Sequence, residues 1–390
     1  MSKKPPRIRH AKLSPSSAAR WMSCPGSVAL CAGLPDVGSK AASEGTMMHT
    51  VAAHCLTAGT DAAGYIGVTD PDTGLILQAE QANAVQSYVT HVRGIVEATG
   101  GALLVEQRVS IAHMTGERGA HGTADAVILA DDELIVLDAK FGRGVVVEAD
   151  NNPQLLMYAH AAMVEHAIAY DFKRVRVGII QPRLGATPEW TLSVEELEEF
   201  AVQALEAANF TRWPDAGLVP SPKACQWCRA KAICPAIRAA VIDDFEDVVP
   251  DTADADNLAR VMANADLIEK WVKAVRAEVE RRLLAGEPIP GYKLVQGKRG
   301  NRQWGDAQVT EQALKGMRIK HDYMYDYKLT SPTSIEKLVK EGSIGPRQWT
   351  KIQGLITQSE GTPSVAPISD KRPVLVTSAA VSDFDDVTNS

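Results

Sequence analysis

The sequence predicts an α/β fold with a mostly helical C-terminal extension. Three features lead to this prediction. Short apolar and β-branched runs typical of strands occur at residues 103–111, 122–140 and 175–181. Helix signals lie among them, including a proline start at residue 153. Residues 257–285 repeat apolar side chains every three or four positions, which is the period of an amphipathic helix.

Composition narrows the class of protein. The chain has 390 residues, 45% of them hydrophobic, and a net charge of −7. That apolar fraction can fill a core. At about 150 residues per domain, the length predicts two or three domains. No apolar run approaches the ~20 residues of a membrane span. The basic N-terminus lacks the apolar stretch of a signal peptide, so we expect a cytoplasmic protein. The acidic balance argues against coating nucleic acid by bulk charge, but it allows a local basic surface.

Six cysteines are present, and their spacing is informative. Cys225, Cys228 and Cys234 form C-x2-C-x5-C followed by proline. A tetrahedral thiolate site needs a fourth ligand, and Cys24, next to Pro25, is the best candidate. Zinc and an iron–sulfur cluster both accept four cysteines, and the spacing does not choose between them.

The richest polar stretch spans residues 122–140. Two apolar runs flank Asp131 and Asp132, which predicts a β-hairpin in which paired residue numbers sum to 263. Asp125 and Asp138 then face each other across the hairpin, a repulsive arrangement unless a cation lies between them. Lys140 follows two residues later and projects from the face of Asp138.

A divalent cation such as Mg²⁺ satisfies both acids and keeps water for chemistry. The alternative is an exposed edge hairpin with solvated acids. Glu106, on the preceding predicted strand, is either a further acidic ligand or a surface charge. His49 lies in an alanine-rich helical segment, where a lone histidine is more often structural. Gln154 and Tyr158 share one face at the start of a helix capped by an asparagine, or else they are an ordinary first turn and a packed tyrosine.

The remainder of the chain is expected to be largely helical. Residues 187–212 predict a helix, and the helix at 257–285 is either a brace on the core or a partner helix. Residues 291–304 predict a hairpin whose basic turn suits phosphate contact, although a solvated turn fits equally well. Two short helices follow near 333–341 and 346–358. The candidate DNA-binding residues of the turn are Lys298, Arg299 and Arg302.

Taken together, the order of these motifs resembles the PD-(D/E)xK nuclease superfamily over residues 13–240, and more narrowly its RecB-like branch. Gly45 to His49 matches the Gly-x-x-x-His helix of that branch, and Gln154 to Tyr158 matches its Gln-x-x-x-Tyr helix. The split cysteine set is similar to that of RecB-like nucleases with a [4Fe–4S] cluster. The whole chain is similar to phage and prophage proteins of a domain-of-unknown-function family. The proline of the superfamily's name is missing before Asp125.

The resemblance implies a restriction-endonuclease-like core, a mixed central sheet flanked by helices, and Mg²⁺- or Mn²⁺-dependent hydrolysis of DNA. It implies an exonuclease rather than an endonuclease, encoded by a bacterium or phage and acting in replication, recombination or repair. A single-strand-binding, helicase or recombinase protein is the expected partner. The alternative is a non-catalytic DNA-binding or scaffolding protein on a nuclease-derived fold.

The resemblance also implies a role for each matching residue. The metal ligands are expected to be His49, Asp125 and Asp138, with the Ala139 carbonyl, and Glu106 is added to them from its strand position. Lys140 orients or activates water, while Gln154 and Tyr158 position the DNA backbone or the lysine. Cys24, Cys225, Cys228 and Cys234 hold the cluster, with Zn²⁺ as the alternative.

The expected domain layout follows from these assignments. A basic flexible arm covers residues 1–12 and the RecB-like nuclease domain covers 13–240. An acidic linker at 241–256 leads to a helical and hairpin extension at 257–358, and a flexible tail completes the chain at 359–390.

Overall fold

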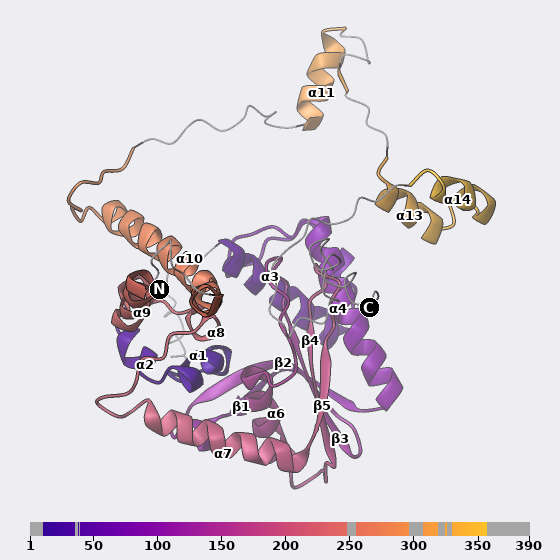
Figure 1. The fold of residues 1–390 in the computed structure, drawn as a ribbon. Coiled ribbons are helices and arrows are strands. Elements are labelled where there is room, and N and C mark those ends of the chain that lie inside the picture. Colours follow the sequence, from indigo (N-terminus) through magenta and orange to yellow (C-terminus); the bar gives the residue numbers. More distant parts are fainter. Residues whose placement is uncertain are drawn as a thin grey trace, which may run out of the picture. The chain divides into compact units, whose positions relative to one another are not determined.

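The computed structural model describes residues 11–35, 38, 40–247, 255–295, 307–318, 324–325 and 330–356. The chain divides into two compact units, Met1–Val295 and Gln296–Ser390. The first unit contains an α/β fold, as predicted, with a mixed sheet flanked by helices (Figure 1).

The sheet has five strands in the order β1-β2-β3-β4-β5. Strands β3 and β4 are parallel and every other neighbouring pair is antiparallel. The parallel pair requires a crossover, which α6 (Pro153–His166) provides. The strands are β1 (Ala102–Ser110), β2 (His121–Leu129), β3 (Glu133–Ala139), β4 (Arg174–Ile180) and β5 (Glu189–Ser193).

The hairpin of β2 and β3 has the predicted register. Pairing runs from Leu129 opposite Leu134 to Ala126 opposite Leu137, so the residue numbers sum to 263 as expected. Asp125 and Asp138 come directly after the last of these pairs. The hairpin therefore delivers both acids to the same end of the two strands.

Strand β3 is buried throughout, and its side chains alternate between two cores. Leu134 and Val136 pack in the core covered by α1 (Ala18–Ser23), α6 and α7 (Val194–Phe210). Ile135 and Leu137 pack in the core covered by α3 (Lys40–Ala58) and α4 (Ala79–Thr99). Because both faces of the sheet are covered, any polar group on β3 is placed in a dry environment.

The crossover helix α6 begins as its sequence predicts. Pro153 occupies the first turn, and the side chain of Asn152 accepts hydrogen bonds from the backbone N–H groups of Gln154 and Leu155. These bonds satisfy donors that the first turn of a helix leaves free. The cap fixes Gln154 beside the end of β3.

Two helix predictions need correction. Residues 187–212 are not one helix, because Glu189–Ser193 forms β5 and α7 begins only after Ser193, which caps it. Trp190, Thr191 and Leu192 favour a strand, and pairing with β4 overrides the helical pattern that follows. No pattern predicted α4, which covers the sheet beside α3.

The cysteine segment is helical and packs beside the N-terminal helices. Residues 241–247, expected to start a linker, are the end of α9. Helix α10, expected to start the C-terminal extension, packs against α8, η3 and α9 and belongs to the first unit. The elements are η1 (Pro15–Ser17), α2 (Ser27–Leu30), α8 (Pro222–Cys225), η3 (Lys231–Ile233), α9 (Pro235–Asp247) and α10 (Ala255–Leu284).

The second unit contains α11 (Ala307–Gly316), α13 (Pro332–Lys340) and α14 (Pro346–Gln353). The last two are the predicted short helices, although α14 ends earlier than expected. The predicted basic turn with Lys298, Arg299 and Arg302 lies outside the described residues, as do the tail at 359–390 and most of the arm at 1–12. Among the described helices, none has the length and apolar character to cross a bilayer.

Candidate metal site

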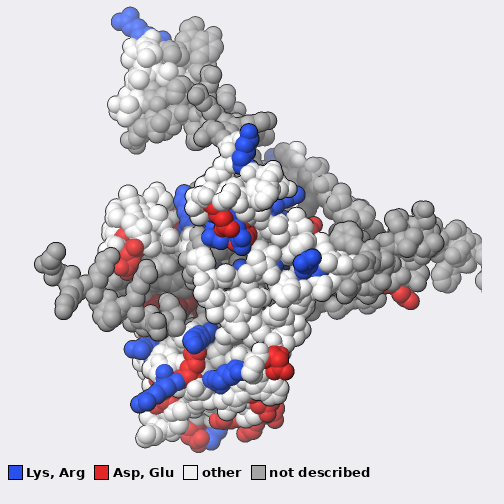
Figure 2. All heavy atoms as spheres, turned by 90° about the vertical axis from the view of Figure 1, so that its left-hand side faces the viewer, with Lys and Arg blue, Asp and Glu red and all other residues white. Residues whose placement is uncertain are grey.

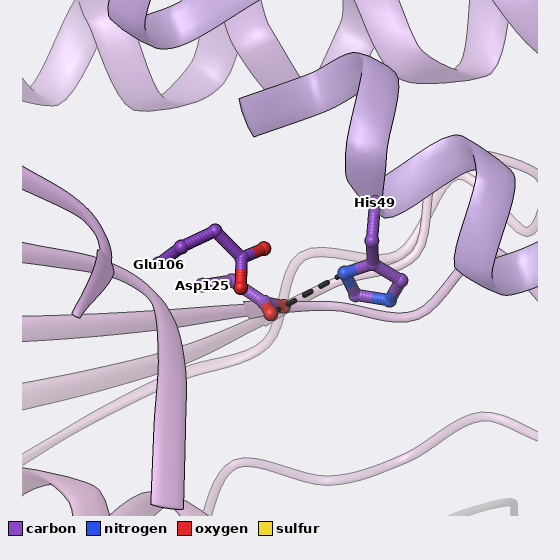
Figure 3. A group of neighbouring side chains, drawn as sticks. All are labelled: His49, Glu106 and Asp125. Carbon is purple, nitrogen blue, oxygen red and sulfur yellow. Dashed lines mark ion pairs between the residues drawn. The ribbon is translucent and has the colours of Figure 1, made fainter. Parts of the chain in front are cut away.

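Three side chains from three elements converge at one end of the sheet. His49 comes from α3, Glu106 from β1 and Asp125 from β2 (Figure 3). One ligand atom of each lies within 4.8 Å of the others, and His49 Nδ1 is 3.3 Å from Asp125 Oδ1. They line an open cavity of about 750 Å³ beside α3. Imidazole and carboxylate groups in this arrangement suit a divalent cation.

Glu106 is held in an unusual backbone conformation. Its φ is +50°, in the left-handed region that few residues other than glycine adopt. Its neighbours Val105 and Gln107 pair regularly with Ala126 and Ala124. Glu106 therefore lies opposite Asp125, at a local distortion of β1. Backbone strain of this kind collects at functional sites, which supports a role for this acid.

The negative charge of Asp125 shifts the pKa values of Glu106 and His49. Burial raises the pKa of Glu106, and the negative charge of Asp125 raises it further. Burial alone lowers the pKa of His49, but the hydrogen bond and charge of Asp125 outweigh it and the net shift is upward. Both upward shifts follow in part from the nearby negative charge of Asp125, which a bound cation would oppose.

Asp138 and Lys140 form a second part of the site. Lys140 Nζ lies 2.7 Å from Asp138 Oδ2, which agrees with the prediction that both side chains project from one face. Gln154 links the pair, because its Nε2 donates to Asp138 Oδ1 at 2.8 Å and its Oε1 accepts from Lys140 Nζ at 3.2 Å. Asp138 Oδ2 is buried and receives no hydrogen bond of regular geometry among the described residues.

The pKa shifts of this pair follow from its burial. Burial raises the pKa of Asp138, against the opposing effect of the Lys140 charge. Burial by itself lowers the pKa of Lys140, but attraction to Asp138 outweighs it and the net shift is upward. Lys140 is therefore an ammonium at neutral pH, able to donate to an anionic group.

The two acids of the hairpin adjoin each other but have different partners. Asp125 Oδ2 accepts the backbone N–H of Ala139 at 2.7 Å, so its carboxylate reaches across to the end of β3. Its other oxygen faces His49 on α3, whereas Asp138 is bound by Gln154 on α6. Asp138 lies outside the tight group of three, and the predicted four side-chain metal ligands are thus divided into three and one.

Tyr158 is buried one turn after Gln154. A Cβ on Gly122 would lie 2.6 Å from a ring carbon of Tyr158, so only glycine at that position of β2 leaves room for the ring. Burial raises the pKa of Tyr158, and the charge of Asp138 adds to the effect. The phenol is therefore neutral beside the site.

Tyr88 and Phe141 are parts of the site that no sequence pattern indicated. Tyr88, on α4, is fully buried, and its hydroxyl has no hydrogen-bond partner among the described residues. Burial, with the charges of Asp125 and Asp138, raises its pKa well above the ordinary value. Phe141 packs edge-on against His49, with ring centroids 5.2 Å apart. Its position directly after Lys140 was the only available clue.

Arg183 joins the elements around the cavity and was also not predicted. Its guanidinium donates to Glu44 on α3, to Glu80 on α4, and to the carbonyl of Phe141 at 2.9 Å. Glu44 is five residues before His49 on the same helix. Arg183 therefore holds α3, and with it the histidine, against the end of β3.

The cysteines gather at the junction of the N-terminal helices and α8–α9. The four predicted ligands are buried. The charges of Cys24 and Cys234 affect the pKa of Cys225, which burial raises. Cys228 instead contacts Cys31, with the sulfur atoms 3.7 Å apart, so a fifth thiol joins the set. In the part of the chain that the structure describes, no three sulfurs lie within 4.8 Å of one another.

A second polar cluster lies on the other face of the sheet. His113 Nε2 and His160 Nδ1 are 2.8 Å apart, and His160 Nε2 is 3.1 Å from Glu198 Oε2. Both nitrogens of the buried His160 are thus hydrogen-bonded. These two hydrogen bonds connect α5 (Ala112–Thr115), α6 and α7, and they leave neither ring nitrogen of His160 unpaired.

The fold and the site define an α/β protein with a candidate divalent-cation centre at one end of a mixed sheet. The chain belongs to the family described as "Protein of unknown function (DUF2800)", whose model matches residues 10–373. Among solved structures, one titled "Crystal structure of SSO0001" is similar over 39% of this chain and 70% of that chain, with 13% identity and a TM-score of 0.22. A likeness at that TM-score adds nothing to the fold described above.

Proposed function

We propose that this chain is a divalent-metal-dependent nuclease that hydrolyses DNA phosphodiesters on a restriction-endonuclease-like core of the RecB type. The observation that carries the proposal is the convergence of His49, Glu106 and Asp125 beside the Asp138–Lys140 pair. The hydrogen bonds from Gln154 to Asp138 and from Lys140 to Gln154 support the proposal.

The residues present fit a cation on physical grounds. Two carboxylates and an imidazole face one point, the pKa values of Glu106 and His49 are shifted upward, and Glu106 has a strained backbone. His49, Glu106 and Asp125 would hold Mg²⁺ or Mn²⁺, with Asp138 beside them. When bound, such an ion supplies charge neutralisation for a phosphate and acidifies water.

Lys140 has a role of its own. Because Asp138 and Gln154 fix its ammonium and its pKa is shifted upward, it stays protonated at neutral pH. We therefore assign it to stabilising negative charge on the phosphate and orienting water, not to removing a proton. Gln154 acts as a positioning residue, because it holds Asp138 with its amide nitrogen and Lys140 with its amide oxygen.

The buried thiols support a metal centre joining the N-terminal helices to the end of the core. The resemblance favours a [4Fe–4S] cluster at these thiols, and Zn²⁺ is the alternative because it also accepts four cysteines. Cys24, Cys225, Cys228 and Cys234 would be its ligands.

The test is a cleavage assay with end-labelled single- and double-stranded DNA in Mg²⁺, Mn²⁺ or chelator. We expect release of label only with a divalent ion, and none from Asp138→Asn, which keeps the size of the side chain. Cleavage in chelator, or undiminished cleavage by Asp138→Asn, would refute the proposal. DNA binding without turnover would instead support the non-catalytic DNA-binding alternative.

A further inference from the structure

The cysteine segment carries a surface that the candidate metal site does not use. Residues 216–242 contain four basic residues and no acidic residue, although the whole chain is acidic. Trp227, between Cys225 and Cys228, is 78% exposed. Its indole face is therefore open to a ligand.

The basic side chains of the cysteine segment and of α10 come from elements that pack together. Lys223, Arg229 and Lys231 lie on the same segment, Arg238 lies on α9, and Lys270 lies on α10. Burial lowers the pKa of Lys231, and the positive charge of Lys270 lowers it further, so like charges are close here. α10 packs against η3, which brings these cations onto one part of the unit.

Two of these cations donate hydrogen bonds to backbone carbonyl oxygens. Lys231 Nζ donates to the carbonyl of Gln226 at 2.7 Å, and Arg229 donates to the carbonyl of Leu34 at 3.1 Å. Within the described ranges, none of the five cations forms an ion pair with a carboxylate. Figure 2 shows the side of the molecule that lies on the left in Figure 1, where Lys and Arg side chains lie near Asp and Glu side chains, with broad uncharged areas between them.

A cavity of about 520 Å³ adjoins the segment and is lined in part by Ile233, Arg238, Ile242 and Trp271. Trp271 Nε1 is buried, with no acceptor among the described residues. The surface therefore offers an exposed aromatic face and a hollow with a cation beside it.

We propose that this surface, formed by Lys223, Trp227, Arg229, Lys231, Arg238 and Lys270, binds single-stranded DNA. Unpaired cations fit phosphates, and an exposed indole stacks on an unpaired base, whose face a duplex would hide. The identity of the ligand rests on the proposed DNA substrate. The binding surface itself is independent of cleavage.

The experiment measures binding of the full chain to a fluorescein-labelled oligo(dT) of twenty nucleotides in EDTA, by anisotropy. We expect Trp227→Ala to weaken binding about tenfold, as loss of one stacked base does. Trp213→Ala is the matched control, because Trp213 is also exposed (57%) but lies outside the segment. It should bind as the wild type does.

The basic residues are tested by salt dependence. Lys223→Ala with Arg238→Ala should reduce the slope of log affinity against log salt by about 1.4, or ~0.7 for each lost phosphate contact. Exposed Lys173, on another part of the unit, serves as the charge control through Lys173→Ala. Unchanged melting temperatures would show that all variants fold.

Three outcomes would overturn the proposal: unchanged binding by Trp227→Ala, equal weakening by Trp213→Ala, or equal affinity for duplex DNA. Binding to anionic phospholipid vesicles without binding to oligo(dT) would assign the surface to a membrane and would also overturn it. All arms run in chelator. Failure of the nuclease proposal would therefore appear separately, as absent cleavage in Mg²⁺ with intact oligo(dT) binding.

Discussion

Two polar clusters flank the same sheet, and they are built in opposite ways. On the α3 side, Glu106 and Asp125 face each other next to His49, and the backbone of Glu106 is strained. On the α6 side, His113, His160 and Glu198 form a continuous chain of hydrogen bonds. The second cluster is complete by itself, whereas the first gathers negative charge that only a cation would balance.

This difference separates a candidate functional site from a structural one. A buried polar group adds to stability when its partners are present, and costs free energy when they are missing. The α6-side cluster should therefore matter for folding, and the α3-side cluster for metal binding and activity. Variants in the two clusters can break or sharpen that distinction.

The largest effect is expected for Asp125→Asn. It removes the charge shared by His49 and the Ala139 N–H, so DNA cleavage should fall by at least about 100-fold. Cleavage rates at saturating Mn²⁺ provide the measurement. Glu198→Gln is the matched control, since it alters the other cluster and should leave the rate unchanged. Equal losses in both variants would contradict the comparison.

Lys140→Met should also lower cleavage by about 100-fold, but for a different reason. The ammonium that we propose faces the phosphate is lost, while His49, Glu106 and Asp125 remain in place. Mn²⁺ binding, followed by calorimetry, should persist. If the variant loses its metal as well as its activity, the division of the site into an ion-binding part and a cationic part is wrong.

His160→Ala should destabilise the fold by about 2 kcal/mol, because His113 and Glu198 lose their shared partner. The free energy of unfolding in urea measures this effect. Cleavage per folded molecule should stay at the wild-type level. A fall in activity without a fall in stability would place this cluster in the functional machinery.

Glu106→Gln should have a smaller effect of opposite sign on stability. In chelator it removes the repulsion from Asp125 and should stabilise the fold by about 0.5 kcal/mol. The folded-state pKa of Glu106 is raised above its unfolded value. The wild type therefore gains stability relative to the variant as pH falls through the raised pKa, and the gain is complete below the unfolded value. Thermal unfolding from pH 4 to pH 7 in chelator, a range set by the ordinary glutamate pKa, measures it. If Glu106→Gln is less stable than the wild type at neutral pH in chelator, Glu106 and Asp125 do not repel each other in the folded state.

The acid response of the other cluster has the reverse sign. Burial lowers the pKa of His113, and the neighbouring His160 lowers it further. The folded state therefore resists a proton that the unfolded state accepts, and stability is lost as pH falls below the ordinary histidine value. His113→Gln should flatten this part of the pH profile. An unchanged slope would mean that other groups cause it.

Much of the fold followed from local patterns in the sequence. The hairpin register could be calculated from Asp131 and Asp132, because a tight turn fixes every later pair. The start of α6 followed from Asn152 and Pro153, whose capping chemistry is local. The strand β5 was missed because its pairing with β4 is a long-range contact that outweighs the adjacent helical pattern.

The sequence indicated candidate residues for the site but not their contacts. The resemblance grouped His49, Asp125 and Asp138 as ligands, whereas in the structure Asp138 contacts Lys140 and Gln154. Side-chain direction at the end of a strand depends on which helix covers it, which spacing does not reveal. Tyr88 was not identifiable, since α4 showed no pattern of its own.

The most direct test is anomalous diffraction from a crystal soaked in Mn²⁺. We predict one strong peak bounded by the imidazole of His49 and the carboxylates of Glu106 and Asp125. A peak at another place in the chain, or none at these three groups under saturating Mn²⁺, would contradict the assignment of this end of the sheet to a metal.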